Sequence, residues 1–234
     1  MAKYEGANNL QPLWDSMHLA RCALTPPTLQ HNKYKIVPTT KPKTVAIIGG
    51  GIGGMECALV LKRRGHKPVI FEKTDRLGGP VPTASSMSFK ENDKQLIEWY
   101  KKEIARNGIE VRFNTEINDI RTIGNFDEII VATGSVPRKM PIPGFDKTMT
   151  LTELLAEKKE VGDKVVIFGG GQSGCEAALE LVLQGKHPTI VEYAVDLVAA
   201  ANVPLPNASY LREALVFHEV PIYLESTITN IKDG

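Results

Sequence analysis

The chain has 234 residues, with 28 lysines and arginines against 27 aspartates and glutamates and a formal net charge of +1. This near-neutral balance removes the electrostatic case for a nucleic-acid partner or an anionic membrane surface. No apolar run reaches the roughly 20 residues needed to span a bilayer, and the polar amino terminus has no signal-peptide core. The composition therefore predicts a soluble globular protein.

Cysteine and histidine usage indicates neither disulfides nor a bound metal. The 3 cysteines, Cys22, Cys57 and Cys175, form no disulfide framework and no metal-ligand spacing, and the 5 histidines are scattered. A reducing compartment, the cytoplasm, fits this usage. Cys57 and Cys175 form no Cys-x-x-Cys pair, so we expect small core residues and no disulfide-reductase chemistry.

Residues 1–43 are expected to form an amino-terminal arm and connector. Residues 15–23 are compatible with one or two helical turns. Prolines then favour an extended chain over residues 24–43, because proline lacks the N–H group that helices and inner strands need. These prolines are Pro26, Pro27, Pro38 and Pro42.

The most informative stretch is Val45 to Leu77, which predicts a strand, a glycine-rich turn, a helix and a second strand. Gly49, Gly51 and Gly54 occupy the G-x-G-x-x-G register. The first glycine permits a sharp turn, the second lets the backbone approach a pyrophosphate, and the third lets the helix pack closely on the strand. The start of the helix presents free N–H groups to the phosphates. The stretch therefore predicts a dinucleotide-binding βαβ unit.

An acidic residue, Glu72, ends the second strand of this unit. It lies about 20 residues beyond the glycines, where a carboxylate can accept the hydroxyl groups of an adenosine ribose. Gly79 follows and would keep the backbone near the nucleotide. Lys73 and Arg76 are expected either near the adenosine and its phosphates or on the solvated surface.

The same stretch recurs from Val165 to Leu197 and aligns with the first copy without a gap. Gly169, Gly171 and Gly174 repeat the glycine register, and Glu192 repeats the acid. Internal similarity of this kind indicates two copies of one supersecondary unit. One such site is typical of a dehydrogenase, whereas two predict a flavoprotein with FAD in one site and a nicotinamide nucleotide in the other.

The region between the two copies predicts a loop over residues 81–90, an amphipathic helix over 92–107 and a short strand over 109–113. A further apolar run, residues 129–131, predicts a buried strand. It ends in three small residues that would let the chain pass close to a nucleotide, namely Ala132, Thr133 and Gly134.

A stiff crossing segment separates the two predicted domains, because prolines at 137, 141 and 143 restrict the backbone. We place the first domain at residues 44–143 and the second at 144–234. In the second domain we expect a short helix over residues 152–159, a proline-containing loop over 202–206, a helix over 208–218, and strands over 220–224 and 227–231. The last two residues form a hairpin-turn signal with no returning strand, so we expect a chain cut short at its carboxyl end.

A family resemblance is carried by four segments: GGGIGGMECA, VIFEKTDRLGG, IIVATGSVPR and VVIFGGGQSGCEAALEL. Over about residues 20–234 the chain resembles the C-terminal part of the NADH:flavin oxidoreductases related to 2-enoate reductase, 2,4-dienoyl-CoA reductase and trimethylamine dehydrogenase. The more specific pointers are CALTP at 22–26, FKENDKQLIEWY at 89–100, and the pair Glu192-Tyr193. The resemblance implies an α/β fold with two Rossmann-like domains.

The resemblance also implies a longer enzyme. In this family a (β/α)8 barrel holds FMN and acts on the substrate, and a 4Fe-4S cluster passes on electrons that enter from NADH through FAD. The chain has no barrel, and Cys22 alone stands at the cluster position, where one thiolate cannot hold a cluster. The final segment, in which an acidic residue would contact the flavin, is expected to be missing beyond Gly234. FMN and the cluster are therefore expected only in a full-length enzyme.

The resemblance assigns FAD to the first site and NADH to the second. Glu192 repels a 2′-phosphate and the next three residues include no arginine, so NADH is predicted over NADPH. No residue is convincing as an acid or base catalyst, as suits hydride transfer between cofactors. The expected FAD contacts are Gly49, Gly51, Gly53, Gly54, Glu72, Lys73, Arg76, Gly79, Ala132, Thr133 and Gly134, and the expected NADH contacts are Gly169, Gly171, Gly174 and Glu192.

Three functions remain open at this point. The chain is the electron-input module of a flavin oxidoreductase, a non-catalytic module that holds an adenine nucleotide for structure, or a stand-alone NADH-dependent diaphorase that serves a separate acceptor protein. The expected partners are the dinucleotides, with a barrel domain, an acceptor protein or a second copy of the chain as further possibilities.

Overall fold

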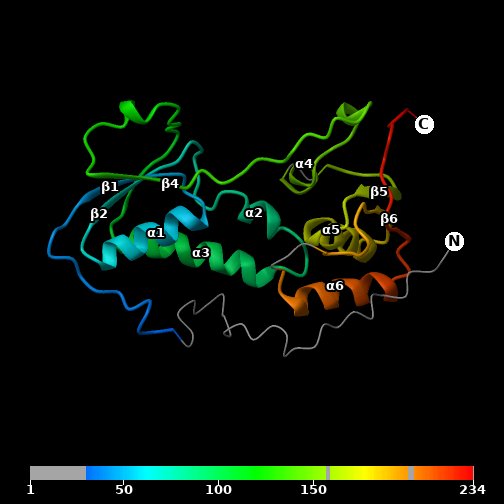
Figure 1. The fold of residues 1–234 in the computed structure, drawn as a ribbon, viewed down its shortest axis with the longest axis horizontal. Helices are drawn as coiled ribbons and strands as arrows, with labels where there is room; N and C mark the ends of the chain where they lie inside the picture. Colours follow the sequence, from blue (N-terminus) through cyan, green and yellow to red (C-terminus); the bar gives the residue numbers. More distant parts are fainter. Residues whose placement is uncertain (1–29, 157–158, 200–202, 234) are drawn as a thin grey trace. The chain divides into compact units, whose positions relative to one another are not determined.

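The computed structural model describes residues 30–156, 159–199 and 203–233. The helical turns predicted over 15–23, and Cys22, lie outside these residues. The described chain divides into two compact units, shown in Figure 1: an N-terminal unit of residues 30–86 and 90–136, and a C-terminal unit of residues 87–89 and 137–233.

The N-terminal unit contains a parallel sheet of four strands in the order β3-β2-β1-β4. Parallel pairing requires crossover connections, and helix α1 provides the one between β1 and β2. The strands are β1 (Thr44–Ile48), β2 (Lys67–Phe71), β3 (Glu110–Arg112) and β4 (Glu128–Val131), and the helices are α1 (Ile52–Arg63), α2 (Val81–Ala84), α3 (Glu91–Arg106) and the 3-10 helix η1 (Ile120–Thr122).

Both faces of this sheet are covered. On one face, α1 and α3 pack on residues of β1 and β2 and form the main core, with Ile47, Met55 and Leu59 fully buried. On the other face, Ala46 and Phe71 pack against the segment between β3 and β4, which is drawn in green in Figure 1. Coverage of both faces explains why β1 and β2 are almost uninterrupted apolar runs.

The C-terminal unit repeats this arrangement with three strands in the order β5-β6-β7, again all parallel. Its core lies between the sheet and helices α5 and α6, with Cys175, Ile190 and Leu215 fully buried. The elements are η2 (Phe145–Lys147), α4 (Leu151–Ala156), β5 (Lys164–Phe168), α5 (Gln172–Leu183), β6 (His187–Val191), α6 (Leu205–Phe217) and β7 (Ile222–Tyr223).

The internal repeat predicted from the sequence is confirmed in the strand registers. Pro68 on β2 lies opposite Val45 on β1, and Pro188 on β6 lies opposite Val165 on β5. The predicted α/β fold with Rossmann-like units is therefore correct.

The two units differ at the strand edge next to the glycine loop. Among the described residues, β5 has no neighbour that corresponds to β4 on β1. The effect is visible at one pair of equivalent positions: Ala46 on β1 is fully buried, whereas Val166 on β5 is 64% exposed.

Four element predictions need correction. The run Ile129 to Val131 is an exposed edge strand instead of a buried one, since Ile129 is 38% exposed and Val131 67%. Residues 81–90 are not all loop, because α2 occupies Val81–Ala84. Helix α6 begins earlier than predicted, at Leu205, because proline is tolerated in a first helical turn.

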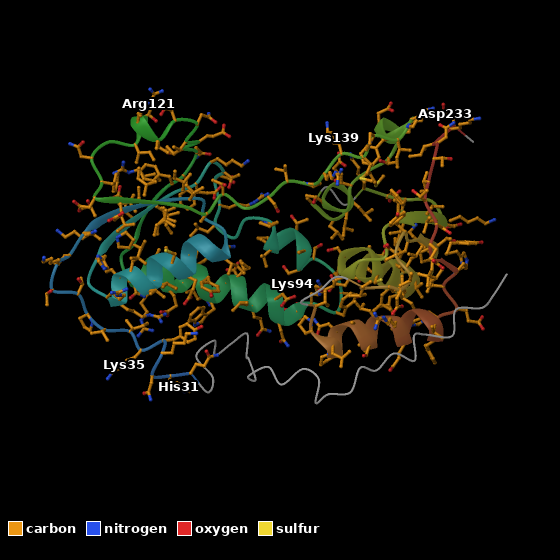
Figure 2. All side chains as sticks on the ribbon, viewed as in Figure 1. His31, Lys35, Lys94, Arg121, Lys139 and Asp233 are labelled. Atoms are coloured by element: carbon orange, nitrogen blue, oxygen red, sulfur yellow. The ribbon has the colours of Figure 1, made fainter. Side chains whose placement is uncertain are left out.

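The fourth correction concerns residues 227–231, which form no strand. The Ile231 N–H donates to the Pro143 carbonyl at 2.9 Å, and the Asp233 carboxylate, labelled in Figure 2, pairs with Lys147. The end of the described chain is therefore held by the segment that opens the C-terminal unit.

None of the helices in the described ranges combines the length and apolar character needed to cross a membrane.

Close packing of helix on strand depends on the third glycine of each motif. A Cβ at Gly54 would collide with the Gly49 carbonyl oxygen, and one at Gly174 would collide with the Gly169 carbonyl oxygen. A Cβ at the neighbouring Gly53 would meet no atom within 4 Å. Two adjacent glycines of one helical turn therefore face opposite constraints.

We predict that Gly54→Ala lowers the stability of the N-terminal unit by about 1–3 kcal/mol, since the backbone must shift to admit the methyl group. Gly53→Ala is the matched control and is expected to raise stability by about 0.5–1 kcal/mol, because alanine favours a helix over glycine. Chemical denaturation of both variants provides the measurement. Equal effects of the two substitutions would contradict the packing role of Gly54.

Candidate nucleotide-binding sites

Each glycine loop ends at the start of a long helix, where helix geometry leaves the first N–H groups without a partner inside the helix. Gly51 caps α1 with φ −71° and ψ −178°, and Gly171 caps α5 with φ −68° and ψ 177°; neither cap has a side-chain hydrogen bond. A Cβ at either cap would meet no atom within 4 Å. The space at both caps can therefore admit a phosphate next to the backbone.

The first glycine of each motif turns the chain out of its strand with a positive φ of 112° at both Gly49 and Gly169. Only glycine adopts this conformation without strain. A Cβ at Gly49 would also collide with the Ala132 carbonyl oxygen and lie 3.2 Å from the Thr133 Cα. The structure thus brings Ala132 and Thr133 to the first glycine loop, and the exposed Gly134 follows them with a φ of 72°.

The acid after β2 is bound to the glycine loop itself. The Gly50 N–H donates to Glu72 Oε2 at 2.7 Å, and the Thr74 N–H and hydroxyl both donate to Glu72 Oε1 at 2.8 Å. Glu72 is only 7% exposed. The carboxylate therefore joins the end of β2 to the turn after β1, and about one of its four acceptor positions remains for a ribose hydroxyl.

Opposing effects set the pKa of Glu72. Burial by itself raises the pKa, because it disfavours the charged form. Hydrogen bonds from the Thr74 N–H, the Gly50 N–H and the Thr74 hydroxyl outweigh burial, and Lys73 adds a favourable charge, so the pKa lies below its ordinary value of 4.5. Glu72 is consequently a carboxylate at neutral pH.

The second acid makes the equivalent connection. The Gly170 N–H donates to Glu192 Oε2, and the Ala194 N–H donates to Glu192 Oε1 at 2.6 Å. The described Glu192 thus accepts fewer hydrogen bonds than Glu72 and keeps about two acceptor positions, enough for the two hydroxyls of an unmodified ribose.

The remaining predicted contacts of the first site divide into two groups. Gly79 lies beside the loop, because a Cβ there would be 3.2 Å from the Gly51 Cα. Gly53, Lys73 and Arg76 are exposed. The second copy has Ser173 in place of Gly53, so this position does not require glycine in both loops.

The middle glycine of each GGG run, Gly50 or Gly170, is a functional position that the predicted contacts do not include. A Cβ at Gly50 would lie 2.6 Å from Leu77 Cδ2, and one at Gly170 would lie 2.5 Å from Leu197 Cδ2. The signal was present, because both copies have glycine at this variable position of the motif. The Thr74 hydroxyl bond to Glu72 is unmatched in the second copy, because Ala194 stands at the equivalent position and donates only its N–H to Glu192.

The cysteines that follow the glycine loops are structural. Cys175 is fully buried and its thiol donates to the Gly170 carbonyl at 3.2 Å. Burial and the nearby Glu192 raise its pKa to about 12. Burial and Glu56 also raise the pKa of Cys57, which packs against the N-terminal core. Both thiols are therefore protonated at neutral pH and unsuited to nucleophilic attack.

Comparison with known families identifies the chain. The family model described as pyridine nucleotide-disulphide oxidoreductase matches residues 43–234. Cinnamate reductase of Clostridium sporogenes is 37% identical over 216 residues, which are 91% of this chain and 32% of that protein. NADH oxidase of Thermoanaerobacter brockii is 35% identical over 186 residues, which are 76% of this chain and 28% of that protein.

A solved structure of 2-naphthoyl-CoA reductase, in complex with 2-naphthoyl-CoA, superposes with a TM-score of 0.80 at 30% identity and covers 91% of this chain and 33% of that one. The chain thus spans about a third of the length of the relatives it matches. It belongs to the pyridine nucleotide-disulphide oxidoreductase family and corresponds to the C-terminal part of the 2-enoate and dienoyl-CoA reductases.

Proposed function

We propose that this chain is the electron-input module of a flavin-dependent oxidoreductase, with FAD at the first glycine loop and NADH at the second. Electrons would pass on to a barrel domain or acceptor protein that reduces an enoate-type substrate. The names of cinnamate reductase and 2-naphthoyl-CoA reductase support that substrate class, since both indicate an unsaturated carbonyl compound. The cysteine usage favours the cytoplasm.

The observation that carries this proposal is the duplicated loop. Gly51 and Gly171 each leave open space at a helix N-terminus. In each loop the N–H of the glycine just before them donates to the acid, from Gly50 to Glu72 and from Gly170 to Glu192. Binding of a single nucleotide would require only one loop of this geometry, so two such loops favour two bound nucleotides. When bound, a flavin and a nicotinamide supply the hydride chemistry themselves, and the protein supplies binding and orientation.

The residues divide this work in a simple way. The free N–H groups at the start of α1 and α5 bind the phosphates, and the acids fix the ribose. Ala132 and Thr133 line the first loop, where their backbone approaches Gly49. All these contacts concern the adenosine diphosphate part of a dinucleotide, so ADP alone is the natural competitor at the second site.

The decisive experiment is an anaerobic absorbance titration of the purified chain, supplied with FAD, against NADH. We expect a bound flavin band at roughly 450 nm that NADH bleaches. A bound flavin that NADH leaves unchanged would contradict electron input. A chain that takes up no FAD but binds ADP would instead be a nucleotide-holding module.

Preference for NADH over NADPH is predicted from Glu192. Its carboxylate can accept ribose hydroxyls but repels a 2′-phosphate, so we expect NADH to bind at least about tenfold more tightly than NADPH. Glu192→Gln should weaken NADH binding and narrow this ratio. Calorimetric titration with both nucleotides measures it, and tighter binding of NADPH by the unmodified chain would refute the assignment.

Loss of the Glu72 charge is predicted to damage both FAD binding and stability. In Glu72→Gln the amide NH2 faces N–H and O–H donors, so we expect a loss of about 1–3 kcal/mol in unfolding free energy and weaker FAD binding. Because the folded pKa is lowered, the stabilisation by Glu72 exists above pH 4.5 and is lost as the pH falls through the lowered pKa.

The measurement for Glu72 is denaturation of the variant and the unmodified chain at pH 7 and at pH values below 4.5. The difference in stability between them should shrink on acidification. Glu213→Gln, at an exposed position of α6, is the charge-matched control and should show neither effect. A stability difference independent of pH would show that the charge of Glu72 is not what binds the loop.

A further inference from the structure

A strained residue lies directly against the second glycine loop. Val198 has a φ of +50° and is 4% exposed, and its N–H donates to the Gly170 carbonyl at 2.8 Å. A β-branched side chain in the left-handed region is a genuine outlier, which persists only where surrounding contacts enforce it. The contacts that hold Val198 in this conformation therefore also influence the position of the second glycine loop.

The first copy avoids this strain. Gly78 stands at the equivalent place, with a φ of +116°, and its N–H donates to the Gly50 carbonyl at 2.9 Å. Glycine adopts a positive φ readily, so the first loop needs no external support at this point. The same hydrogen bond is made in both copies, but only the second makes it from a strained residue.

Arg212 on α6 supplies the support in the second copy. Its Nε and Nη2 atoms donate to the Leu197 carbonyl at 3.0 and 2.6 Å, and Nη2 lies 2.9 Å from Asp196 Oδ2. The side chains of Arg212 and Asp196 are only 18% and 16% exposed. A planar guanidinium can make these bonds at fixed angles, which a lysine cannot.

Among the described residues, helix α3 of the first copy has no arginine at the position that matches Arg212. The buried residues Ile97 and Ile104 of α3 correspond to Ala208 and Leu215 of α6. In this alignment of the two helices, Lys101 occupies the position equivalent to Arg212. Lys101 instead pairs with Glu98 on its own helix at 2.7 Å. The Arg212 contacts thus occur in the copy whose loop residue is Val198, and the equivalent helix position makes no such contacts in the copy whose loop residue is Gly78.

We propose that Arg212 is a positioning residue of the second nucleotide site. It fixes the backbone of residues 196–198, and these in turn fix Gly170 through the Val198 hydrogen bond and the buried Leu197 side chain. Arg212 acts on the phosphate loop without touching the nucleotide. This inference rests on the proposed function of the second site as an adenine dinucleotide site.

The test is a double-mutant cycle on the full chain, with NADH affinity as the readout. Arg212→Met keeps the apolar stem but removes every donor, and we expect NADH to bind about tenfold more weakly. Val198→Gly removes the strain and keeps the N–H that bonds to Gly170, and its NADH affinity is the baseline of the cycle. In the double variant Val198→Gly/Arg212→Met the affinity should return to within about twofold of Val198→Gly.

Recovery of NADH affinity in the double variant distinguishes a positioning role of Arg212 from a purely structural one. If Arg212 only stabilised the fold, Arg212→Met would lower the melting temperature and glycine at 198 would restore no affinity. Lys101→Met is the matched control on α3 and should change neither FAD nor NADH binding. If Arg212→Met does not fold, the same comparison is made with Arg212→Lys. Lysine retains the positive charge but lacks the planar set of donors of the guanidinium group.

Two results would overturn the inference: NADH binding by Arg212→Met equal to that of the unmodified chain, or a double variant as weak as Arg212→Met. Failure of the unmodified chain to bind either NADH or ADP at the second site is a different result. It would remove the proposed function before any variant is compared.

Discussion

The hydrogen bond from the middle glycine of each loop to the acid at the end of the second strand is the contact on which both sites depend. Glu72 and Glu192 accept the N–H groups of Gly50 and Gly170 and so join two neighbouring strand ends across the turn. A buried carboxylate requires such partners, because burying an unpaired charge is costly. The same carboxylates lie at the carboxyl edge of the sheet, where parallel α/β sheets bind their ligands. Under the proposed function, loop geometry and ribose binding would therefore be coupled through one side chain in each unit.

Comparison of the two copies shows that this geometry is set locally. A Cβ at Gly49 would collide with Ala132, the residue after the edge strand β4, whereas a Cβ at Gly169 would meet no atom within 4 Å, yet both glycines have a φ of 112°. The caps Gly51 and Gly171 likewise agree within a few degrees. The edge strand is thus not what bends the loop. The turn, the acid and the close packing of helix on strand suffice.

The sequence predicts well whatever is determined by local chemistry. The glycine register and the acids follow from local chemistry, and Gly49 and Gly169 have the positive φ that a sharp turn requires. Predictions that depended on neighbours were less secure. The run Ile129 to Val131 has the apolar character of a buried strand, but its exposure depends on what lies beside the edge of the sheet. Residues 227–231 contain the β-branched residues that strands favour, yet a strand also requires a partner, and the described Ile231 instead bonds to Pro143.

Membership of a family named for disulphide reduction does not carry that chemistry to this chain. Disulphide exchange needs a thiolate, and in the described ranges Cys57 and Cys175 lie on separate helices with raised pKa values. The thiol of Cys175 serves the fold instead, since it donates to the carbonyl of the glycine that Glu192 holds from the other side. What this chain shares with its relatives is a way of holding nucleotides, and a fold of this kind is compatible with many acceptors. Under the proposed electron-input function, the nucleotide loops would therefore not determine which acceptor receives the electrons.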